Sequence, residues 1–508
     1  MAFDSLRAFV DALRRAGELQ EVSVPVNPHL EISEIADRVV KAGGPALLFT
    51  KVRGSEFPVL INQFGSERRM AMAFGARTLD EVAQRLARLL NLSVPASSGE
   101  RLAKLLSLTP FLNAIPRTQT HGSCQDVVVP KPDLRRFPVL TTWPLDAGPF
   151  ITLPLVITKD PQTGAQNVGM YRMQVYDAKT TGMHWQRHKH GRAQARGWGA
   201  RVPVAVAIGT DPAVTYAATA PLPPIVDEMA LAGLLRGKAA KVVRAKTVDL
   251  KVPADAEFVL EGYVDNTDLR TEGPFGDHTG VYSLADSYPT FHVQCITHRK
   301  HPIYAATVVG KPPMEDAWLG KSTERLFLPI LQMIVPEIVD MNLPVEGGFH
   351  NLALVSIKKA YPGHAYKVMN ALWGLGHMMM LTRMLIIVDA DVNVHDTRSV
   401  AWFALNNIDA RRDVVIMQGP VDDLDHASHT PALGAKVGVD ATRKTSAEGY
   451  VREWPPDMLM DEATRALVNS RWKEYGLQHI ATAGAATDGW SGQGPAALAR
   501  LLGDARRR

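Results

Sequence analysis

The sequence predicts a protein of mixed α and β structure with three consecutive regions. Helical segments and short apolar strands mix over the first part of the chain, a period of two in hydrophobicity dominates the middle, and apolar strands alternate with helices after about residue 350. Period-two alternation is typical of antiparallel sheets, and strand–helix alternation indicates a largely parallel sheet. We therefore expect an N-terminal α/β region over residues 1–120, a middle β domain over 121–320, and a C-terminal α/β domain with a tail over 321–508.

The composition is that of a globular protein with more than one core. Of 508 residues, 46% are hydrophobic and 21% are charged, and at about 150 residues per domain this length predicts two or three domains. The formal net charge of +4 is too small to indicate a nucleic-acid partner. Cys124 and Cys295 are the only cysteines, which excludes a disulfide-built scaffold and a four-cysteine metal site within one chain. These features favour a cytoplasmic protein.

The chain opens with an amphipathic helix instead of a signal peptide. Leu6, Phe9, Val10 and Leu13 follow Asp4 at helical spacing. We expect no membrane span, because the most apolar long stretch, residues 371–388, contains charged and imidazole side chains before it reaches the ~20 residues that a span needs.

Each region contains segments with a clear periodicity. The first region carries apolar strands at residues 46–49 and 58–61, and frequent prolines between 130 and 154 then exclude long helices. In the middle region the apolar residues Phe258, Leu260 and Val264 alternate with Glu257, Glu261 and Tyr263. The same period of two returns at Phe291, Val293 and Cys295, and a helix is expected near 225–236. In the last region we expect strands at 352–357, 384–388 and 414–417 and helices at 363–377 and 397–406.

Two polar clusters fall early in the middle region. The first runs from Asn167 to Arg172, where an amide can supply a hard oxygen ligand and a guanidinium can bind a carboxylate or phosphate. The second runs from Met183 to Gly191 and contains three imidazoles and two cations, which suits a metal and an anionic cofactor. The alternatives are a surface strand with one ion pair and a solvated basic turn.

Two acidic clusters follow. Asp227 and Glu228 open the expected helix, where acids also serve the helix dipole. Glu272 and Asp277 stand five residues apart and are separated by two glycines and a proline. A rigid turn that presents two acids to one cavity explains this spacing, and a plain connecting loop is the alternative.

In this order the four clusters resemble those of the UbiD-type decarboxylases, which use prenylated FMN. The resemblance includes the segments NPHLEI at 27–32, GGPALLF at 43–49 and LGAKVGVDAT at 433–442, and it covers roughly residues 1–455. It implies that the middle domain is a split β-barrel that binds the flavin and a metal. It also implies that the C-terminal domain supplies an oligomer interface.

The resemblance implies which residues bind the metal and the cofactor. Asn167, His188 and Glu228 would hold a divalent metal, usually Mn²⁺, that bridges to the cofactor phosphate, with K⁺ nearby. A hard cation agrees with oxygen-rich ligands and an anionic partner. The implied cofactor-binding positions are Asn167, Met170, Tyr171, Arg172, His184, Trp185, Gln186, His188, Lys189, His190 and Glu228. Some ubiquinone-pathway members differ from this chain at 184–186 and 189–190, which leaves the substrate open.

The resemblance also implies a catalytic trio of Glu272, Arg172 and Asp277. Loss of CO₂ from an sp² carbon leaves electron density that no side chain can delocalise, so a cofactor must accept it. Arg172 would orient the substrate carboxylate, and an acid with a raised pKa would protonate the carbon. We expect Asp277 to donate the proton and Glu272 to support it, with the acid nearer Arg172 ionised and the other one protonated.

The substrate that the resemblance favours is 4-hydroxy-3-polyprenylbenzoate, on the way to ubiquinone. Another aromatic or unsaturated acid, such as a menaquinone precursor, is the alternative within the family. The expected partners are a flavin prenyltransferase that supplies the cofactor and further copies of the chain in a dimer or hexamer, with at most peripheral contact with the inner face of the cell membrane. Two other classes remain open: a metal-dependent hydrolase built from His184, His188, Glu228 and Asp277, and a flavin-binding protein without catalysis.

Overall fold

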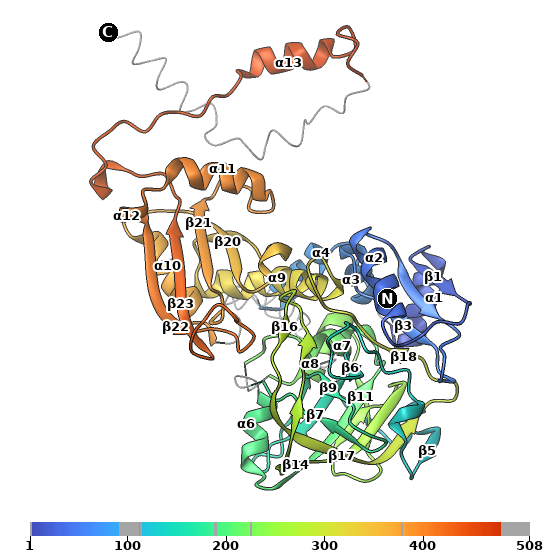
Figure 1. The fold of residues 1–508 in the computed structure, drawn as a ribbon. Helices are drawn as coiled ribbons and strands as arrows, with labels where there is room; N and C mark the ends of the chain where they lie inside the picture. The colour runs from blue at the N-terminus through green and yellow to red at the C-terminus, as the bar shows by residue number, and fades with distance from the viewer. Residues whose placement is uncertain are drawn as a thin grey trace, which may run out of the picture. The chain divides into compact units, whose positions relative to one another are not determined.

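The computed structural model describes residues 3–90, 111, 114–186, 190–223, 226–376 and 379–478, and Figure 1 shows their helices and strands. The contacts divide the chain into two compact units. The first contains Met1–Ile330, Gly376–Met378 and Asp422–His426, and the second contains Leu331–Leu375, Met379–Val421 and Ala427–Arg508.

The first unit begins with helices and a small four-stranded sheet. Its elements are α1 (Leu6–Arg15), β1 (Leu19–Val22), α2 (Glu31–Lys41), β2 (Ala46–Phe49), β3 (Val59–Ile61), α3 (Glu67–Ala73) and α4 (Leu79–Leu90), and the sheet order is β1-β2-β3-β18. The expected first helix is confirmed, because Leu6, Phe9, Val10 and Leu13 are buried on one face. Ser5 caps the helix with its side chain, whereas Asp4 pairs with Arg236 and Lys238 further along the chain.

The middle of the first unit is mainly antiparallel sheet. Its elements are β4 (Arg117–Gln119), η2 (Ser123–Gln125), β5 (Val127–Val129), η3 (Leu134–Arg136), β6 (Phe150–Ile151), β7 (Leu155–Lys159), β8 (Gln166–Met170), β9 (Met173–Gln174), β10 (Thr180–Gly182), α6 (His190–Gly197), β11 (Arg201–Ile208), α7 (Pro212–Ala217), α8 (Glu228–Arg236), β12 (Lys241–Arg244), β13 (Lys251–Pro253), β14 (Phe258–Glu272), β15 (Phe275–Gly276), β16 (Tyr282–Ser283), β17 (Asp286–His298) and β18 (Tyr304–Ala305).

The largest sheet has the order β10-β17-β14-β11-β7-β8, with β5 paired to β17, and all of its pairings are antiparallel. The predicted antiparallel region is therefore confirmed, and so is the helix expected near 225–236. The sheet is open, because no pairing in the described part of the chain joins β10 to β8. β8, β14 and the hairpin β15-β16 carry the residues of the site.

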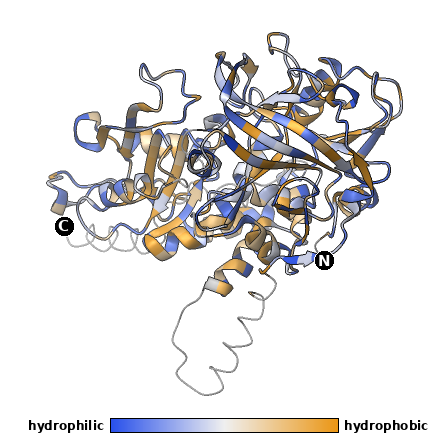
Figure 2. Cartoon of the chain, turned by 90° about the horizontal axis from the view of Figure 1, so that it is seen from below, coloured by the Kyte–Doolittle hydropathy of each residue, from blue (hydrophilic) through white to orange (hydrophobic). Residues whose placement is uncertain are grey.

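The first part of strand β14, residues 258–262, is buried on both faces, although the sequence suggests one apolar and one polar face. Figure 2 shows hydrophobic and hydrophilic residues alternating along the long strands. The acids nevertheless lie inside: Glu257, just before β14, accepts hydrogen bonds from Arg7 and the backbone of Ile303, and Glu261 accepts two from the backbone at 246 and 247. These partners offset the cost of burying a carboxylate.

The second unit is an α/β domain. Its elements, together with the helix that leads into it, are α9 (Glu315–Ile334), β19 (Ile338–Asn342), η4 (Val345–Gly347), β20 (Leu352–Ile357), α10 (His364–Trp373), β21 (Met384–Asp389), α11 (Thr397–Asn407), α12 (Ala410–Asp413), β22 (Val414–Pro420), β23 (Leu433–Asp440), η6 (Ser446–Glu448) and α13 (Glu462–Arg471). The sheet order is β19-β20-β21-β23-β22. Its inner pairings are parallel and its two edge strands are antiparallel. Among the described residues, no helix is long and apolar enough to span a bilayer.

Candidate active site

The side chain of Arg172 joins two carboxylates in the first unit. Arg172 follows β8, and its Nε donates a hydrogen bond of 3.0 Å to Oε1 of Glu272 at the end of β14. A second nitrogen of the guanidinium donates to Oδ2 of Asp277, and a third donates to Ser283 Oγ at 3.0 Å. The guanidinium also lies over the ring of Phe275, 4.8 Å from its centroid. The structure therefore brings the three predicted catalytic residues together.

The loop between the two acids is held at its glycines. Gly273 has φ +87, which favours glycine, and its N–H donates to Gln174 Oε1 at 2.9 Å. The N–H of Gly276 donates to Oδ1 of Asp146 at 2.8 Å. A Cβ at Gly276 would overlap the indole of Trp143. Only glycine therefore lets the chain pass this close to the tryptophan and turn into Asp277.

Both acids of the trio are buried and both have lowered pKa values. Burial alone would raise the pKa of Glu272, but a hydrogen bond from His184 and the charge of Arg172 hold it below its ordinary value. Burial would likewise raise the pKa of Asp277, but His278 and Arg172 lower it. The expectation that the acid nearer Arg172 is ionised and the other one protonated is wrong for this structure, because Arg172 pairs with both acids and the pKa values of both are lowered. The guanidinium is wide enough to pair with both.

Each acid also contacts a histidine. Nδ1 of His184 lies 2.9 Å from Oε1 of Glu272, and the imidazole packs on the ring of Tyr288 at a centroid distance of 4.4 Å. Nδ1 of His278 lies 2.9 Å from Oδ1 of Asp277. The site thus contains two carboxylate–histidine pairs that share one arginine.

A second cluster of predicted residues surrounds the start of α8. Oε2 of Glu228 accepts a 3.0 Å hydrogen bond from the backbone N–H of Val168, the neighbour of Asn167 on β8. Burial raises the pKa of Glu228 to about 7, although the bond from Val168 opposes this. Next to this pair, the hydroxyl of Tyr171 accepts from the backbone N–H of Gly191 at 3.2 Å. The structure therefore brings Asn167 and Glu228 together.

The third predicted metal ligand, His188, lies outside the described residues, and so does Lys189. Among the residues that are described, no group of three or more His, Cys, Asp or Glu side chains could hold a metal. The residues that are present fit the expected groups. The amide of Asn167 and the buried carboxylate of Glu228 offer the oxygen ligands that a hard cation prefers. Nδ2 of Asn167 and Nε1 of Trp185 are buried without a hydrogen-bond partner among the described residues, and such donors suit an anionic group.

The other predicted cofactor positions lie around these two clusters. Met170 ends β8, and Trp185 packs edge-on against Tyr171 with ring centroids 5.3 Å apart. Gln186 donates to Oδ2 of Asp422 at 2.8 Å, a residue of the same compact unit. His190 begins α6, and burial lowers its pKa below its ordinary value.

Several residues of the site were not predicted, among them four that contact Arg172, Asp277 or the loop between the acids. His278 directly follows Asp277, so the motif contained the signal, whereas Ser283 and Phe275 reach Arg172 only through the β15-β16 hairpin. Asp146 is the fourth: its Oδ2 accepts from the backbone N–H groups of residues 142 and 143, while its Oδ1 holds the loop at 276. No periodicity in the sequence marks Asp146 or Ser283.

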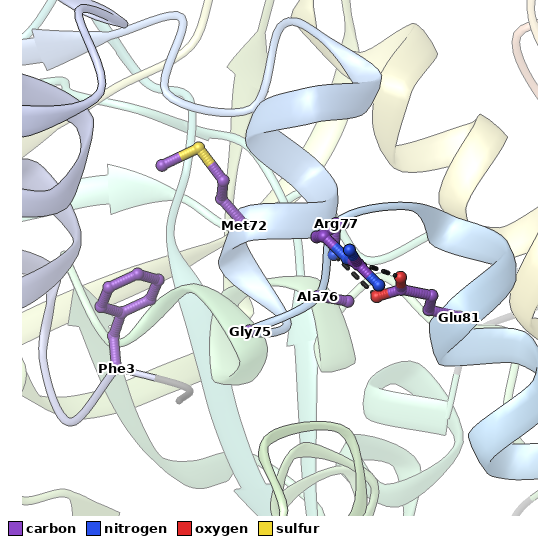
Figure 3. Close-up of a pocket in the computed structure, with 6 residues that line it drawn as sticks. All are labelled: Phe3, Met72, Gly75, Ala76, Arg77 and Glu81. Atoms are coloured by element: carbon purple, nitrogen blue, oxygen red, sulfur yellow. Dashed lines mark hydrogen bonds and ion pairs between the residues drawn. The ribbon is translucent and has the colours of Figure 1, made fainter.

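A separate pocket of about 400 Å³ lies in the N-terminal part of the first unit (Figure 3). Its lining residues are Phe3, Met72, Gly75, Ala76, Arg77 and Glu81. Arg77 and Glu81 form an ion pair of 3.0 Å at its edge. The pocket contains none of the predicted site residues.

Comparisons with known proteins agree with the fold. Three family models match: the N-terminal, Rift-related and C-terminal domains of 3-octaprenyl-4-hydroxybenzoate carboxy-lyase, over residues 10–90, 117–312 and 317–441. An uncharacterized protein of Archaeoglobus fulgidus is 54% identical over 479 residues, which cover 93% of this chain and 99% of that protein. One from Aquifex aeolicus is 45% identical over 483 residues, with coverages of 94% and 99%.

Solved structures are similar over most of the chain. The closed form of vanillic acid decarboxylase from Sedimentibacter hydroxybenzoicus has a TM-score of 0.81 and 26% identity, and the match covers 95% of this chain and 100% of that one. The UbiD-class enzyme HmfF from Pelotomaculum thermopropionicum, in complex with FMN, has a TM-score of 0.73 and 28% identity, with coverages of 89% and 97%. The chain belongs to the UbiD family and is a carboxy-lyase.

Proposed function

We propose that the protein removes CO₂ from an aromatic carboxylic acid with prenylated FMN as its cofactor. The observation that supports this most strongly is Arg172, which is paired with the buried acids Glu272 and Asp277. A structurally similar enzyme, HmfF, has a solved complex with FMN, and an evolved dimeric form of HmfF has a solved complex with prFMN. When bound, prenylated FMN supplies the electron sink that side chains lack.

The side chains around the site would bind and orient the substrate. A guanidinium has five N–H groups, and the bonds to Glu272, Asp277 and Ser283 leave two of those of Arg172 to bind a substrate carboxylate. The ring of Phe275 closes one face of this guanidinium and keeps water from it. Of the two acids, Asp277 is proposed to protonate the carbon and Glu272 to hold Arg172 in place.

Asn167, His188 and Glu228 are proposed to hold a divalent metal, Mn²⁺, with K⁺ nearby. The buried position of Glu228 supports a cation there, because an ionised carboxylate in a site of low polarity is stabilised by a positive charge. Asn167 and Trp185 would then donate to the anionic part of the flavin. A metal-dependent hydrolase that uses His184 is less well supported, because His184 pairs with Glu272 and not with Glu228.

The finer proposal for the substrate is 4-hydroxy-3-polyprenylbenzoate, as a step toward ubiquinone. The family models, described for 3-octaprenyl-4-hydroxybenzoate carboxy-lyase, support it. The likeness to vanillic acid decarboxylase favours a small phenolic acid as the second candidate. A polyprenyl chain would require peripheral contact with a bilayer, so flotation with anionic liposomes at low salt distinguishes the polyprenylated substrate from the small phenolic acid. A protein that never floats, with or without substrate, contradicts the polyprenylated substrate.

We further propose that residues 121–320 form the flavin-binding part, as a split β-barrel, and that residues 321–508 supply the contact in a dimer or hexamer. Size-exclusion chromatography with light scattering of the full chain tests the oligomer. A full chain that is monomeric contradicts the oligomer.

The test of the activity is coexpression with a flavin prenyltransferase, followed by assay of CO₂ release from a panel of aromatic acids. We expect a bound flavin and CO₂ release from at least one acid, and loss of the CO₂ in Arg172→Gln. His121→Gln is the control, since His121 belongs to an exposed pair with Asp126. A protein that binds the flavin but releases no CO₂ from any acid is a passive binder, and an activity that needs no flavin indicates a hydrolase.

A further inference from the structure

Neither of the two carboxylates beside Arg172 holds a proton in the resting site. Decarboxylation replaces CO₂ by hydrogen, so each turnover needs one proton at the carbon. Both carboxylates beside Arg172 have pKa values below their ordinary range, which leaves Glu272 and Asp277 ionised at neutral pH. A general acid must hold its proton before it can donate it. The proton must therefore come to the acid from a neighbouring group.

His278 is in direct contact with the acid expected to donate. Its Nδ1 lies 2.9 Å from Oδ1 of Asp277, and its backbone N–H donates to the same oxygen at 2.8 Å. Because an ionised carboxylate only accepts hydrogen bonds, Nδ1 carries the proton in this contact. The imidazole is 15% exposed and Asp277 is 9% exposed, so bulk water competes little for the bond.

Several charges act on this imidazole. Asp277 contacts it directly, and the charges of Asp316, in the first turn of α9, and Asp422, of the same compact unit, act on it in the same direction. Burial raises the pKa of Asp316 itself to about 7. Arg172 donates to the other carboxylate oxygen of the same Asp277. Burial alone would lower the pKa of His278, but these carboxylates raise it above its ordinary value. His278 therefore stays protonated at a pH at which a solvated histidine has lost its proton.

We propose that His278 is the proton reservoir of the site: it protonates Asp277, which passes the proton to the carbon that loses CO₂. The inference rests on the proposed decarboxylation and adds a residue to it. The step balances, because the electron pair of the broken C–C bond takes up the proton, Asp277 returns to carboxylate, and the imidazolium becomes neutral imidazole. Solvent protonates the imidazole again before the next turnover. His278 does not touch the substrate in this scheme, so it is a positioning and proton-supplying residue.

The second histidine of the site is less suited to this role. His184 pairs with Glu272, whose Oε1 also accepts from Arg172, so one oxygen receives both donors. The corresponding donors on Asp277 are divided, with Arg172 on Oδ2 and His278 on Oδ1. Oδ1 of Asp277 can therefore take a proton from His278 without displacing the arginine.

The test is the pH dependence of CO₂ release by His278→Asn, in which the amide nitrogen can replace Nδ1 as a hydrogen-bond donor but cannot titrate. In the parent, kcat should fall as pH rises through the raised pKa of His278. In His278→Asn, kcat should be lower by a factor on the order of 10² and this alkaline fall should be absent. Flavin content and KM should be unchanged. His184→Asn is the matched variant, because it changes the histidine that pairs with Glu272. It should keep the fall of kcat at alkaline pH.

Each outcome decides between the roles. A His278→Asn variant with the parent's kcat and pH profile overturns the proposal, because the hydrogen bond alone would then suffice. A parent without CO₂ release refutes the proposed function before this inference is reached. If the variant does not fold, nitrogen-15 NMR of labelled histidine in the parent gives the answer. A neutral His278 at pH 7 overturns the proposal, and a protonated one whose pKa falls in Asp277→Asn supports it.

Discussion

Arg172 and Glu272 lie 100 residues apart in the sequence, yet Nε of the arginine donates to Oε1 of the acid over 3.0 Å. The arginine comes just after β8 and the acid ends β14, and both side chains are nearly excluded from solvent, at 10% and 0% exposure. Because the guanidinium also reaches Asp277, it fixes the two ends of the loop 272–277 relative to each other. The following predictions depend on this arrangement.

Arg172→Lys should lower kcat/KM by a factor on the order of 10² or more. A lysine has one compact ammonium group and cannot pair with Glu272 and Asp277 at once or present a planar fork to a carboxylate. Steady-state kinetics of CO₂ release measure the effect. The control is Arg270→Lys, at a partly exposed pair with Asp268, which should leave kcat/KM near the parent value. An Arg172→Lys enzyme as active as the parent would show that the fork is not needed.

The two acids should make the fold less stable at low pH. Their pKa values are lowered in the folded protein, so their contribution to the free energy of unfolding is complete above the ordinary carboxyl pKa near 4. It is lost as pH falls through the lowered values. In Arg172→Gln the pKa values of both acids should rise toward or above the ordinary value, because burial then acts without the arginine. The variant should therefore be less stable than the parent at neutral pH, and its Tm should fall less than the parent's as the pH is lowered. Thermal scans between pH 7 and about 3 measure this, with Arg270→Gln as control.

Asp277→Asn should lose turnover by a factor on the order of 10² to 10⁴ while it still binds flavin and substrate, because it keeps its shape but cannot carry a proton. Glu272→Gln should also be impaired, through a weaker hold on Arg172. The measurement is incorporation of solvent deuterium at the former carboxyl carbon. If Asp277→Asn exchanges as fast as the parent and Glu272→Gln does not, the two roles are reversed.

Gly276→Ala should reduce activity through the position of Asp277. Its Cβ would overlap the indole of Trp143, which is itself held by a 2.8 Å hydrogen bond to the carbonyl oxygen of Val309. Overpacking of this kind costs about 1–3 kcal/mol, so Tm should fall and kcat should fall with it. Gly374→Ala is the control, because the atom nearest to its added Cβ, the backbone oxygen of Asn370, lies 3.3 Å away and the φ of Gly374 is negative. An unchanged kcat would mean that the loop can move without displacing Asp277.

Glu228→Gln should remove bound divalent metal and flavin together, since a metal that bridges protein and phosphate couples the two affinities. Elemental analysis and the flavin absorbance of the purified protein measure both. Asp227→Asn is the matched control: Asp227 caps α8 through Met229, and Asn caps as well as Asp does. Full flavin content in a metal-free Glu228→Gln protein would show that the two are bound independently.

Much of the fold could be predicted from local patterns. The helical spacing of Leu6, Phe9, Val10 and Leu13 predicts α1, and the apolar runs predict β2, β3, β20 and β21 to within one residue. Such patterns depend on neighbours in the chain, so one sequence suffices to detect them. The burial of Glu261 could not be predicted in the same way, because its hydrogen-bond partners come from residues 246 and 247, outside its own strand.

The sequence by itself determined the residue types of the site and the order of its motifs. The turn from Glu272 to Asp277 is local, since its glycines and its proline specify a sharp path between the two acids, and it could be identified without a fold. Only the tertiary structure decided which charges meet there. Asp277 lies 105 residues from Arg172 and Asp146 lies 130 residues from Gly276. The order of strands in the sheet brings these groups together, and a period of two carries no information on strand order. The same contacts set the pKa values of both acids, because these depend on the distance between charges and on burial.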